Sequence, residues 1–266
     1  MNTVRPLWLG ALALAIYAFL YAPIVVVVIL AFNAERHGFR WGGITSEWFI
    51  AMANNDLALA ALRNSLLLAG VSTTISTFLG TLLGLGLSRG EFIGKRTLDT
   101  VIQLPVLVPD IVMAVALLLF AHEVRQATGL LELGMTTMIL AHCTFQIPFV
   151  AMVVRARHAG MDPSWVEAAA DLGANPIRTF WSVTLPLLWP GVIAGALLAF
   201  ALSLDDFVIS FFTSGPGSTT LPILIHASVR RGITPDIHAL SSLLVGAAVV
   251  VTLVASRFQR ADDIAH

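Results

Sequence analysis

Adjacent aspartates, Asp205 and Asp206, interrupt a strongly apolar stretch of this chain and are followed directly by Phe207. Two further aromatic side chains, Phe211 and Phe212, follow at spacings that bring ring faces near the carboxylates. Carboxylates beside aromatic rings attract ammonium groups through ion pairing and cation–π interactions. This cluster predicts a path for a positively charged organic substrate rather than for an anion or a sugar.

The two aspartates cannot share one role on a helix, because consecutive helical positions differ in direction by about 100°. One carboxylate could line the path while the other caps a helix or meets Arg230 or Arg231. Charges inside a bilayer are costly and usually face a cavity or a partner. A solvated or salt-bridged pair at a helix end is the alternative, and the sequence leaves both open.

Asp110 is a second acidic candidate for the substrate path. It follows Pro105 and Pro109, which predict a break in the surrounding helix. Asp110 then either caps the next half-helix, which is its more ordinary role, or lies on a transport path, because broken membrane helices commonly line one.

Other chemistries find little support in the sequence. His142 and Cys143 lie in one apolar run with Gln146, but their directions differ by about 100°, which argues against a metal site. Segment 90–96 has three residues between its glycines, and Arg96 stands where a phosphate-binding loop needs Ser or Thr. No nucleophile or acid–base set is evident. We expect a chain that is not an enzyme and holds no metal or cofactor itself.

These candidate sites belong to a chain with the composition of a polytopic membrane protein. It is 57% hydrophobic and 12% charged, with a mean hydropathy of +0.86, and is therefore far more apolar than soluble domains. The formal net charge of −1 argues against nucleic-acid binding. The single cysteine, Cys143, excludes an internal disulfide.

Runs of about 20 apolar residues are long enough to cross a bilayer as helices. They predict an all-α integral membrane protein with about six transmembrane helices, forming a single domain over residues 1–266. The first run is longer than the apolar core of a signal peptide, so we expect an uncleaved helix. The predicted spans are residues 7–32, 62–88, 98–121, 134–154, 186–209 and 237–256.

The distribution of Lys and Arg predicts the orientation of these spans. A cytoplasmic N-terminus places nine basic residues on the cytoplasmic side and six on the other, in the direction of the positive-inside rule. Both termini of the chain are then cytoplasmic. Residues 155–185 become the longest loop on that side.

Two glycine pairs leave helix faces with little side-chain bulk. Gly80 and Gly84 lie in the second predicted span, and Gly191 and Gly195 lie in the fifth. Such faces allow close helix packing in membranes. We expect contacts inside the subunit, with contact to a partner subunit as the alternative.

The loop 155–185 carries two helix starts and a helix stop. Asp162-Pro163 and Asn175-Pro176 each combine a capping side chain with proline at the first helical position. Gly173 lies where a glycine commonly ends a helix. Leu185-Pro186 is expected to turn the chain back into the membrane, so the loop predicts a helix–turn–helix outside the bilayer.

The first helix of this loop has the features of a docking element. Ala168, Ala169 and Ala170 favour helix with almost no side-chain bulk, and Glu167 complements the helix dipole and can meet a basic partner. A rigid helix of this kind fits a groove on a soluble protein. An amphipathic connector resting on the membrane surface is the alternative, and composition alone leaves both open.

The same loop resembles the cytoplasmic signature of ABC importer permeases, which reads Glu-Ala-Ala, three residues, Gly, nine residues, Ile, one residue, Leu-Pro. Glu167-Ala168-Ala169, Gly173 and Leu185-Pro186 fall on this pattern with its spacing intact, and Val183 replaces the isoleucine. The resemblance implies the type I ABC importer permease architecture. It also assigns ATPase coupling to these residues.

Membership of that family would imply several partners. The resemblance implies a second membrane permease subunit and a dimer of cytoplasmic ATPase subunits that bind ATP and magnesium. Closure of the ATPase pair would be transmitted through the loop and would switch the pore between inward- and outward-facing states. The permease itself would carry no nucleotide.

Over nearly its full length the chain also looks like the polyamine class of these permeases, and is most similar to the putrescine type. The segments that carry this resemblance are SLDDFVIS, SGPGSTTLP and PVLVPDIVMAVALLL. It implies import of putrescine or spermidine across a bacterial inner membrane from a periplasmic polyamine-binding protein. A proton- or ion-coupled secondary transporter of organic cations is the alternative, but inverted-repeat halves are not evident.

Overall fold

The computed structural model describes residues 7–35, 40–88, 92–231, 235–246 and 249. Within these ranges the chain is helical and carries no β-strand, apart from an isolated bridge between Asn33 and Ile44. Five of the described helices are long and apolar enough to cross a membrane. The prediction of an all-α membrane fold is confirmed.

The chain forms two compact units, and each is described here by itself. The smaller unit comprises residues 1–59 and 225–266 and includes α1 (Leu7–Leu30) and α2 (Glu47–Ala53). Residues 235–246 are helical, and most of the rest of the sixth predicted span, 237–256, lies outside the described residues. The expectation of a single domain stays a prediction.

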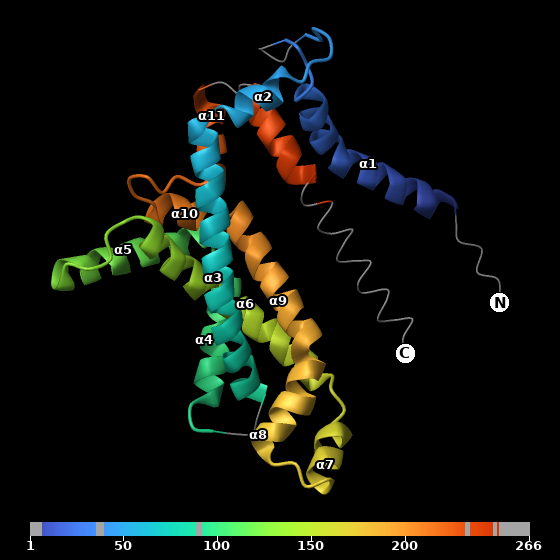
Figure 1. Ribbon diagram of the computed structural model, residues 1–266, viewed down its shortest axis with the longest axis vertical. Coiled ribbons are helices and arrows are strands. Elements are labelled where there is room, and N and C mark those ends of the chain that lie inside the picture. Colours follow the sequence, from blue (N-terminus) through green and yellow to red (C-terminus); the bar gives the residue numbers. More distant parts are fainter. Residues whose placement is uncertain (1–6, 36–39, 89–91, 232–234, 247–248, 250–266) are drawn as a thin grey trace. The chain divides into compact units, whose positions relative to one another are not determined.

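The larger unit, residues 60–224, is built around α6 (Met135–Ala159). Helix α6 packs along α9 (Leu185–Asp205), as Figure 1 shows, and contacts α3 (Asp56–Ser88) at Ser72, Gly80 and Gly84. The buried side chains of Val150, Val154, Leu188 and Val192 fill the contact between α6 and α9. This unit holds both candidate sites.

The two glycine pairs bring α3 and α9 close to α6. A Cβ atom added at Gly84 would lie 2.6 Å from the carbonyl oxygen of Ala151, and one at Gly191 would lie 2.6 Å from Cβ of Arg157. At Gly80 and Gly195 the nearest neighbour would be Val150. All these contacts lie inside one chain, which confirms the expected packing role within the subunit.

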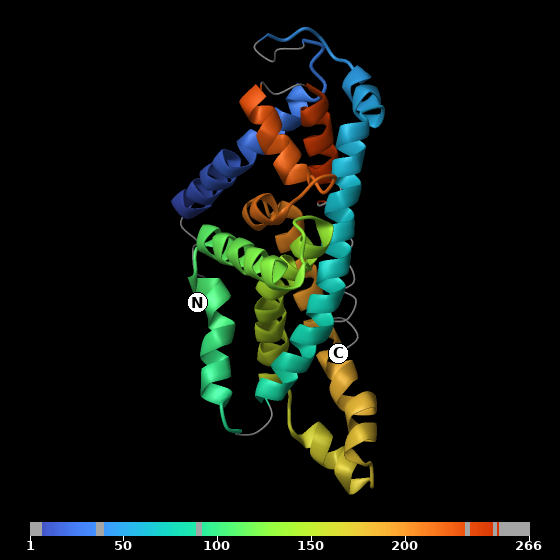
Figure 2. The same ribbon diagram turned by 90° about the vertical axis from the view of Figure 1, so that its left-hand side faces the viewer.

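The third predicted span, 98–121, is not one helix. It divides into α4 (Lys95–Leu107) and α5 (Asp110–Thr128), which meet at a sharp bend visible in Figure 2. Val108 and Pro109 are both extended, with ψ of 131° and 138°. Proline disfavours helix in the residue before it, so the chain breaks at Val108, whereas Pro105 is accommodated within α4.

The chain does not turn at Leu185-Pro186, and this expectation was wrong. Helix α8 (Pro176–Thr179), a π-helical turn (η1, Phe180–Thr184) and α9 form one continuous helical run. Pro186, which has no N–H to donate, lies in the first turn of α9, directly after the π-helical turn. The Leu185 N–H bonds the Phe180 carbonyl, so the wider turn carries the chain past the proline.

The fifth predicted span, 186–209, also ends early. Helix α9 stops at Asp205, and a separate short helix, α10 (Val208–Thr213), follows it. Helix α11 (Leu221–Arg231) follows α10 in the chain (Figure 1). The interruption between α9 and α10 falls at the aspartate pair.

Candidate functional site

The first candidate site is the hairpin, defined as residues 161–178, in which α7 (Ser164–Asp171) is followed by α8. Helix α7 starts one residue later than expected, and Oδ1 of Asp162 accepts a hydrogen bond of 2.9 Å from the Ser164 N–H. The hydrogen bonds from Ser164 lower the pKa of Asp162 below its ordinary value. This side chain therefore caps the helix as the sequence predicts.

Gly173 ends the first helix of the hairpin in the left-handed region, with φ of 81°. The Ala174 N–H bonds the Ala169 carbonyl at 3.0 Å, and the Gly173 N–H bonds the Ala170 carbonyl at 2.9 Å. This pair of hydrogen bonds is the Schellman motif, which favours glycine at this position. The predicted helix stop is confirmed.

Asn175 begins the second helix of the hairpin. Its Oδ1 accepts a hydrogen bond of 2.8 Å from the Arg178 N–H, and Pro176 occupies the first helical position. The backbone of Asn175 is extended (φ −73°, ψ 161°), as expected of a helix cap. The second predicted helix start is confirmed.

No residue of the hairpin is buried. Its large apolar side chains are nevertheless numerous, and Trp165, Leu172 and Ile177 are 60%, 89% and 72% exposed. Apolar side chains gathered on one exposed element commonly mark an interaction surface. The hairpin therefore has the character of a surface that another molecule covers.

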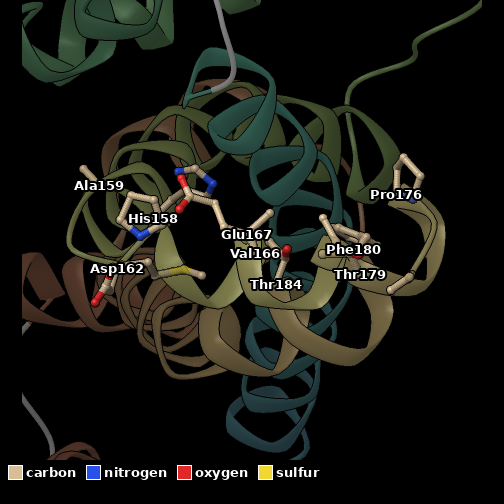
Figure 3. Close-up of a pocket in the computed structure, with 13 residues that line it drawn as sticks. His158, Ala159, Asp162, Val166, Glu167, Pro176, Thr179, Phe180 and Thr184 are labelled. Carbon is tan, nitrogen blue, oxygen red and sulfur yellow. The ribbon is translucent and has the colours of Figure 1, made fainter. Parts of the chain in front are cut away.

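Helix α7 has two distinct faces. A cavity of about 590 Å³ lies between α7 and the α8–η1 segment. Glu167 and Val166 of α7 and Phe180 and Thr184 of η1 are among the side chains around it (Figure 3). Glu167 thus faces into the hairpin.

The outer face of α7, which does not line this cavity, carries Trp165 and Ala168, and Leu172 follows the helix directly. Leu185 and Pro186, by contrast, begin α9 and are not part of the hairpin. The signature residues are therefore divided between an exposed hairpin and the first turn of a spanning helix.

The second candidate site is the junction, defined as residues 203–210, where α9 gives way to α10. Asp205 is the last residue of α9 and is exposed. The carboxylate of Asp206 accepts hydrogen bonds from the Ile209 N–H at 3.2 Å and the Ser210 N–H at 2.8 Å. Asp206 therefore caps the first turn of α10, and Asp205 alone points its charge outward.

His142 of α6 joins the two sides of the junction. It is 1% exposed, and its Nδ1 lies 2.8 Å from Oγ of Ser203 in α9. Its Nε2 lies 3.1 Å from Oγ of Ser210 in α10 and 3.4 Å from Oδ2 of Asp206. A single buried ring thus contacts the end of one helix, the link and the start of the next.

The other sequence-predicted residues lie near this junction. Asp110 is the first residue of α5 and is exposed. The rings of Phe207 and Phe211 lie 5.4 Å apart. Arg230 and Arg231 belong to the other unit, so the possible ion pair with the aspartates stays untested.

The contribution of His142 was missed at the level of sequence. It was considered only as a metal ligand, and the described residues contain no group of three or more metal-binding side chains. A histidine within an apolar helix signals a buried polar partner. Its partners are 61 and 68 positions away in the chain, so the sequence does not identify them.

Apolar helices of spanning length, an exposed hairpin and a polar junction define a membrane-embedded transport subunit. The model of the family described as binding-protein-dependent transport system inner membrane components matches residues 76–263, and the chain belongs to this family. It is therefore a multi-pass inner-membrane transport component and not an enzyme. The family also favours a binding-protein-dependent importer over a secondary transporter.

Several characterised relatives are similar over nearly the whole chain. The putrescine transport system permease protein PotI of Escherichia coli K12 is 40% identical over 257 residues, covering 96% of this chain and 92% of the relative. The spermidine/putrescine transport system permease protein PotC of the same organism is 36% identical over 251 residues, covering 94% and 93%.

Solved structures of low sequence identity share the fold. A chain of a bacterial ABC transporter involved in alginate import has a TM-score of 0.74 at 18% identity, covering 96% of this chain and 94% of its own. A chain of the MetNI methionine ABC transporter has a TM-score of 0.58 at 20% identity, covering 78% and 98%. The type I ABC importer permease fold predicted from the sequence is confirmed.

Proposed function

We propose that this chain is the permease subunit of an ATP-driven polyamine importer, with putrescine or spermidine as its cargo. A second permease subunit completes the translocation path, and a periplasmic polyamine-binding protein delivers the cargo. ATP and magnesium are held by the ATPase subunits, so this chain needs no cofactor of its own.

The observation that carries this proposal is a pair of exposed carboxylates, Asp205 and Asp110, in a chain similar to putrescine permeases. They come from two helices, at the end of α9 and the start of α5. Exposed carboxylates attract a cationic cargo. Phe207 and Phe211, which follow Asp205 in the chain and lie 5.4 Å apart, add aromatic surface that suits an alkyl chain ending in ammonium groups.

The hairpin is the proposed contact with the ATPase. Its large apolar side chains are exposed, its conformation is fixed by its own caps, and it carries Glu167, Ala168, Ala169 and Gly173 of the signature. Leu185 and Pro186 lie where the hairpin continues into α9. Movement of the hairpin would therefore be transmitted along α8, η1 and α9 toward the junction.

The proposed orientation places the hairpin and both termini in the cytoplasm. The excess of Lys and Arg in the loops on that side supports this assignment. The junction, at the opposite end of α9 from the hairpin, would then lie toward the periplasm (Figure 1). Cargo released from a periplasmic binding protein would meet Asp205 early on its path.

Reconstitution in proteoliposomes tests the proposal. The complex of this chain with its second permease and ATPase is supplied with its binding protein. It is expected to import radiolabelled putrescine or spermidine only when ATP is present on the side of the membrane where the ATPase subunits lie. A proton ionophore should leave uptake unchanged. Uptake without ATP, or uptake of neither polyamine, would overturn the proposal.

A further inference from the structure

Asp206 and His142 are the buried polar side chains at the junction that the cargo path does not use. The side chain of Asp206 is 11% exposed, and both of its oxygens accept backbone hydrogen bonds from α10. A carboxylate used in this way has little capacity left for a passing cation. Asp205, one residue earlier, is exposed at the end of α9.

The contacts of His142 extend into a wider polar network. Ser203, which meets Nδ1 of His142, lies 3.5 Å from Oγ of Ser72 in α3. Nε2 of Gln146 donates to Oγ of Ser72 at 3.2 Å and to the Ala199 carbonyl at 3.1 Å. Four helices of the larger unit, α3, α6, α9 and α10, therefore meet through side chains that contact His142 directly or through one intermediate side chain.

We propose that His142 is a positioning residue of the cargo path: with Asp206 it fixes the angle between α9 and α10 and thereby holds the carboxylate of Asp205 toward the cargo. This inference rests on the proposed cargo path at Asp205. The helical run ends at Asp206, where the backbone becomes extended (φ −67°, ψ 120°), so the hydrogen bonds of α9 do not continue into α10 and do not hold the end of α9 against it. The imidazole supplies that constraint by bonding both sides of the break.

Apolar packing supplies part of the same constraint. Ile209 of α10 is buried with Ala114 of α5 and Ala141 of α6, and Phe212 packs against them. This contact holds α10 against its neighbours but does not touch the end of α9. The link between α9 and α10 is therefore assigned to His142 and Asp206, and loss of the imidazole should turn Asp205 without unfolding α10.

Substitutions at His142 separate its two ring nitrogens. Gln reaches the place of Nε2 and keeps a partner for Asp206 and Ser210, whereas Asn reaches only the place of Nδ1, beside Ser203. His142→Leu removes both. Thr144→Val is the matched control, because Thr144 lies on the same helix, is exposed, and bonds only the Leu140 carbonyl of its own helix.

The first measurement is putrescine imported per ATP hydrolysed by the reconstituted complex. We expect a fall of about tenfold in His142→Leu, smaller falls in His142→Asn and His142→Gln because each keeps only one side of the link, and near wild-type values in Thr144→Val. In an Asp205→Asn background, His142→Leu should cause no further fall, since it acts through Asp205. A purely structural role would instead lower the yield of assembled complex and add to the effect of Asp205→Asn.

The second measurement does not depend on the cargo. In the purified complex, a cysteine placed at Asp205 is expected to react rapidly with a water-soluble cationic thiol reagent, and several-fold more slowly when His142 is Leu. Buried Cys143 gives the background rate in the unsubstituted protein. Equal rates with and without the imidazole would overturn the positioning role, whereas failure of wild-type polyamine uptake would overturn only the proposed cargo.

Discussion

The hairpin and the junction occupy opposite ends of α9 and acquire their shapes in different ways. In the hairpin, each helix end is fixed by a residue within a few positions of it, such as Asp162, Gly173 and Asn175. At the junction, the decisive partner of Ser203 and Ser210 is His142, on another helix. The hairpin, which we propose contacts the ATPase, is thus determined by its own sequence, whereas the junction depends on tertiary contacts.

Substitution of Gly173 is expected to have the largest effect on uptake. It tests whether the hairpin depends on the conformation of its own backbone. Open space surrounds this position, so a side chain there would fit but would be strained at φ of 81°. Gly173→Val should reduce ATP-driven uptake by more than about tenfold, since the strain of about 1–2 kcal/mol reshapes the docking surface. Uptake by proteoliposomes and membrane insertion are measured together.

Gly173→Asn is the matched control for this prediction, because asparagine tolerates the left-handed region. We expect it to keep most of the uptake activity. The local account of the hairpin would be contradicted if Val and Asn reduced uptake equally, or if Gly173→Val transported at the wild-type rate.

The aspartate pair provides the next largest effect and tests the division of roles at the junction. Asp205→Asn should lower putrescine uptake by about tenfold while leaving thermal stability unchanged, since an exposed charge is removed from the path. Asp206→Asn should lower both uptake and the melting temperature, because it weakens the cap of α10. Initial uptake rates and thermal unfolding in detergent distinguish the two variants.

The opposite pattern, with stability lost at Asp205 and kept at Asp206, would reverse the assignment. Unchanged uptake in both single variants and in the double variant would remove the cation path altogether.

Substitutions in α3 test whether the junction depends on helix packing elsewhere in the larger unit while the hairpin does not. A methyl group at Gly84 would meet the Ala151 carbonyl of α6, whereas one at Gly86 would meet nothing within 4 Å. Gly84→Ala should lower the melting temperature by a few degrees, and Gly86→Ala should raise it slightly, because alanine favours helix by about 0.5–1 kcal/mol. Thermal unfolding of the two variants gives the comparison.

In the Gly84→Ala variant, the reaction rate of the Asp205→Cys thiol should also change. Hydrogen exchange of the backbone amides of the hairpin should stay as in the wild type. Equal stabilities for Gly84→Ala and Gly86→Ala would show that this packing does not support the junction.

Asp162 gives the smallest expected effect and concerns the pH dependence of the hairpin. Because hydrogen bonding lowers its folded pKa below the ordinary 3.8, its contribution is fully present above that value and is lost as pH falls through the folded pKa. A spin label at Leu172→Cys should therefore stay equally ordered from about pH 7 to 5 and loosen below about pH 4.

Asp162→Asn keeps an oxygen acceptor without the charge and is the control for that titration. The difference between the two proteins isolates Asp162 from the other acids of the hairpin. A difference that appeared near neutral pH would contradict the assignment of the cap to this carboxylate.

The contrast between the regions also explains how much of each could be predicted from sequence. Asp162, Gly173 and Asn175 were correctly predicted because caps and a left-handed glycine are short-range signals. Which of Asp205 and Asp206 caps a helix could not be predicted, because the cap is formed by contacts of Asp206 with His142 and the backbone of α10.

Two predictions about helix continuity illustrate the same limit. The break before Asp110 was anticipated from Pro105 and Pro109, although only Pro109 breaks the chain. The turn expected at Leu185-Pro186 was wrong, because a proline in the first turn of a helix is compatible with a continuous run when a π-helical turn precedes it. Proline marks a possible break, and the surrounding backbone decides whether it occurs.

Site-specific photocross-linking tests the proposed contact between the hairpin and the ATPase, which we expect to involve the outer face of α7. A photoreactive amino acid at Ala168, on the outer face, is compared with one at Ala170, which lines the cavity inside the hairpin. We expect a strong cross-link from position 168 to the ATPase subunit and a much weaker one from position 170. Cross-links from position 168 to lipid alone, with none to the ATPase, would contradict the proposed contact.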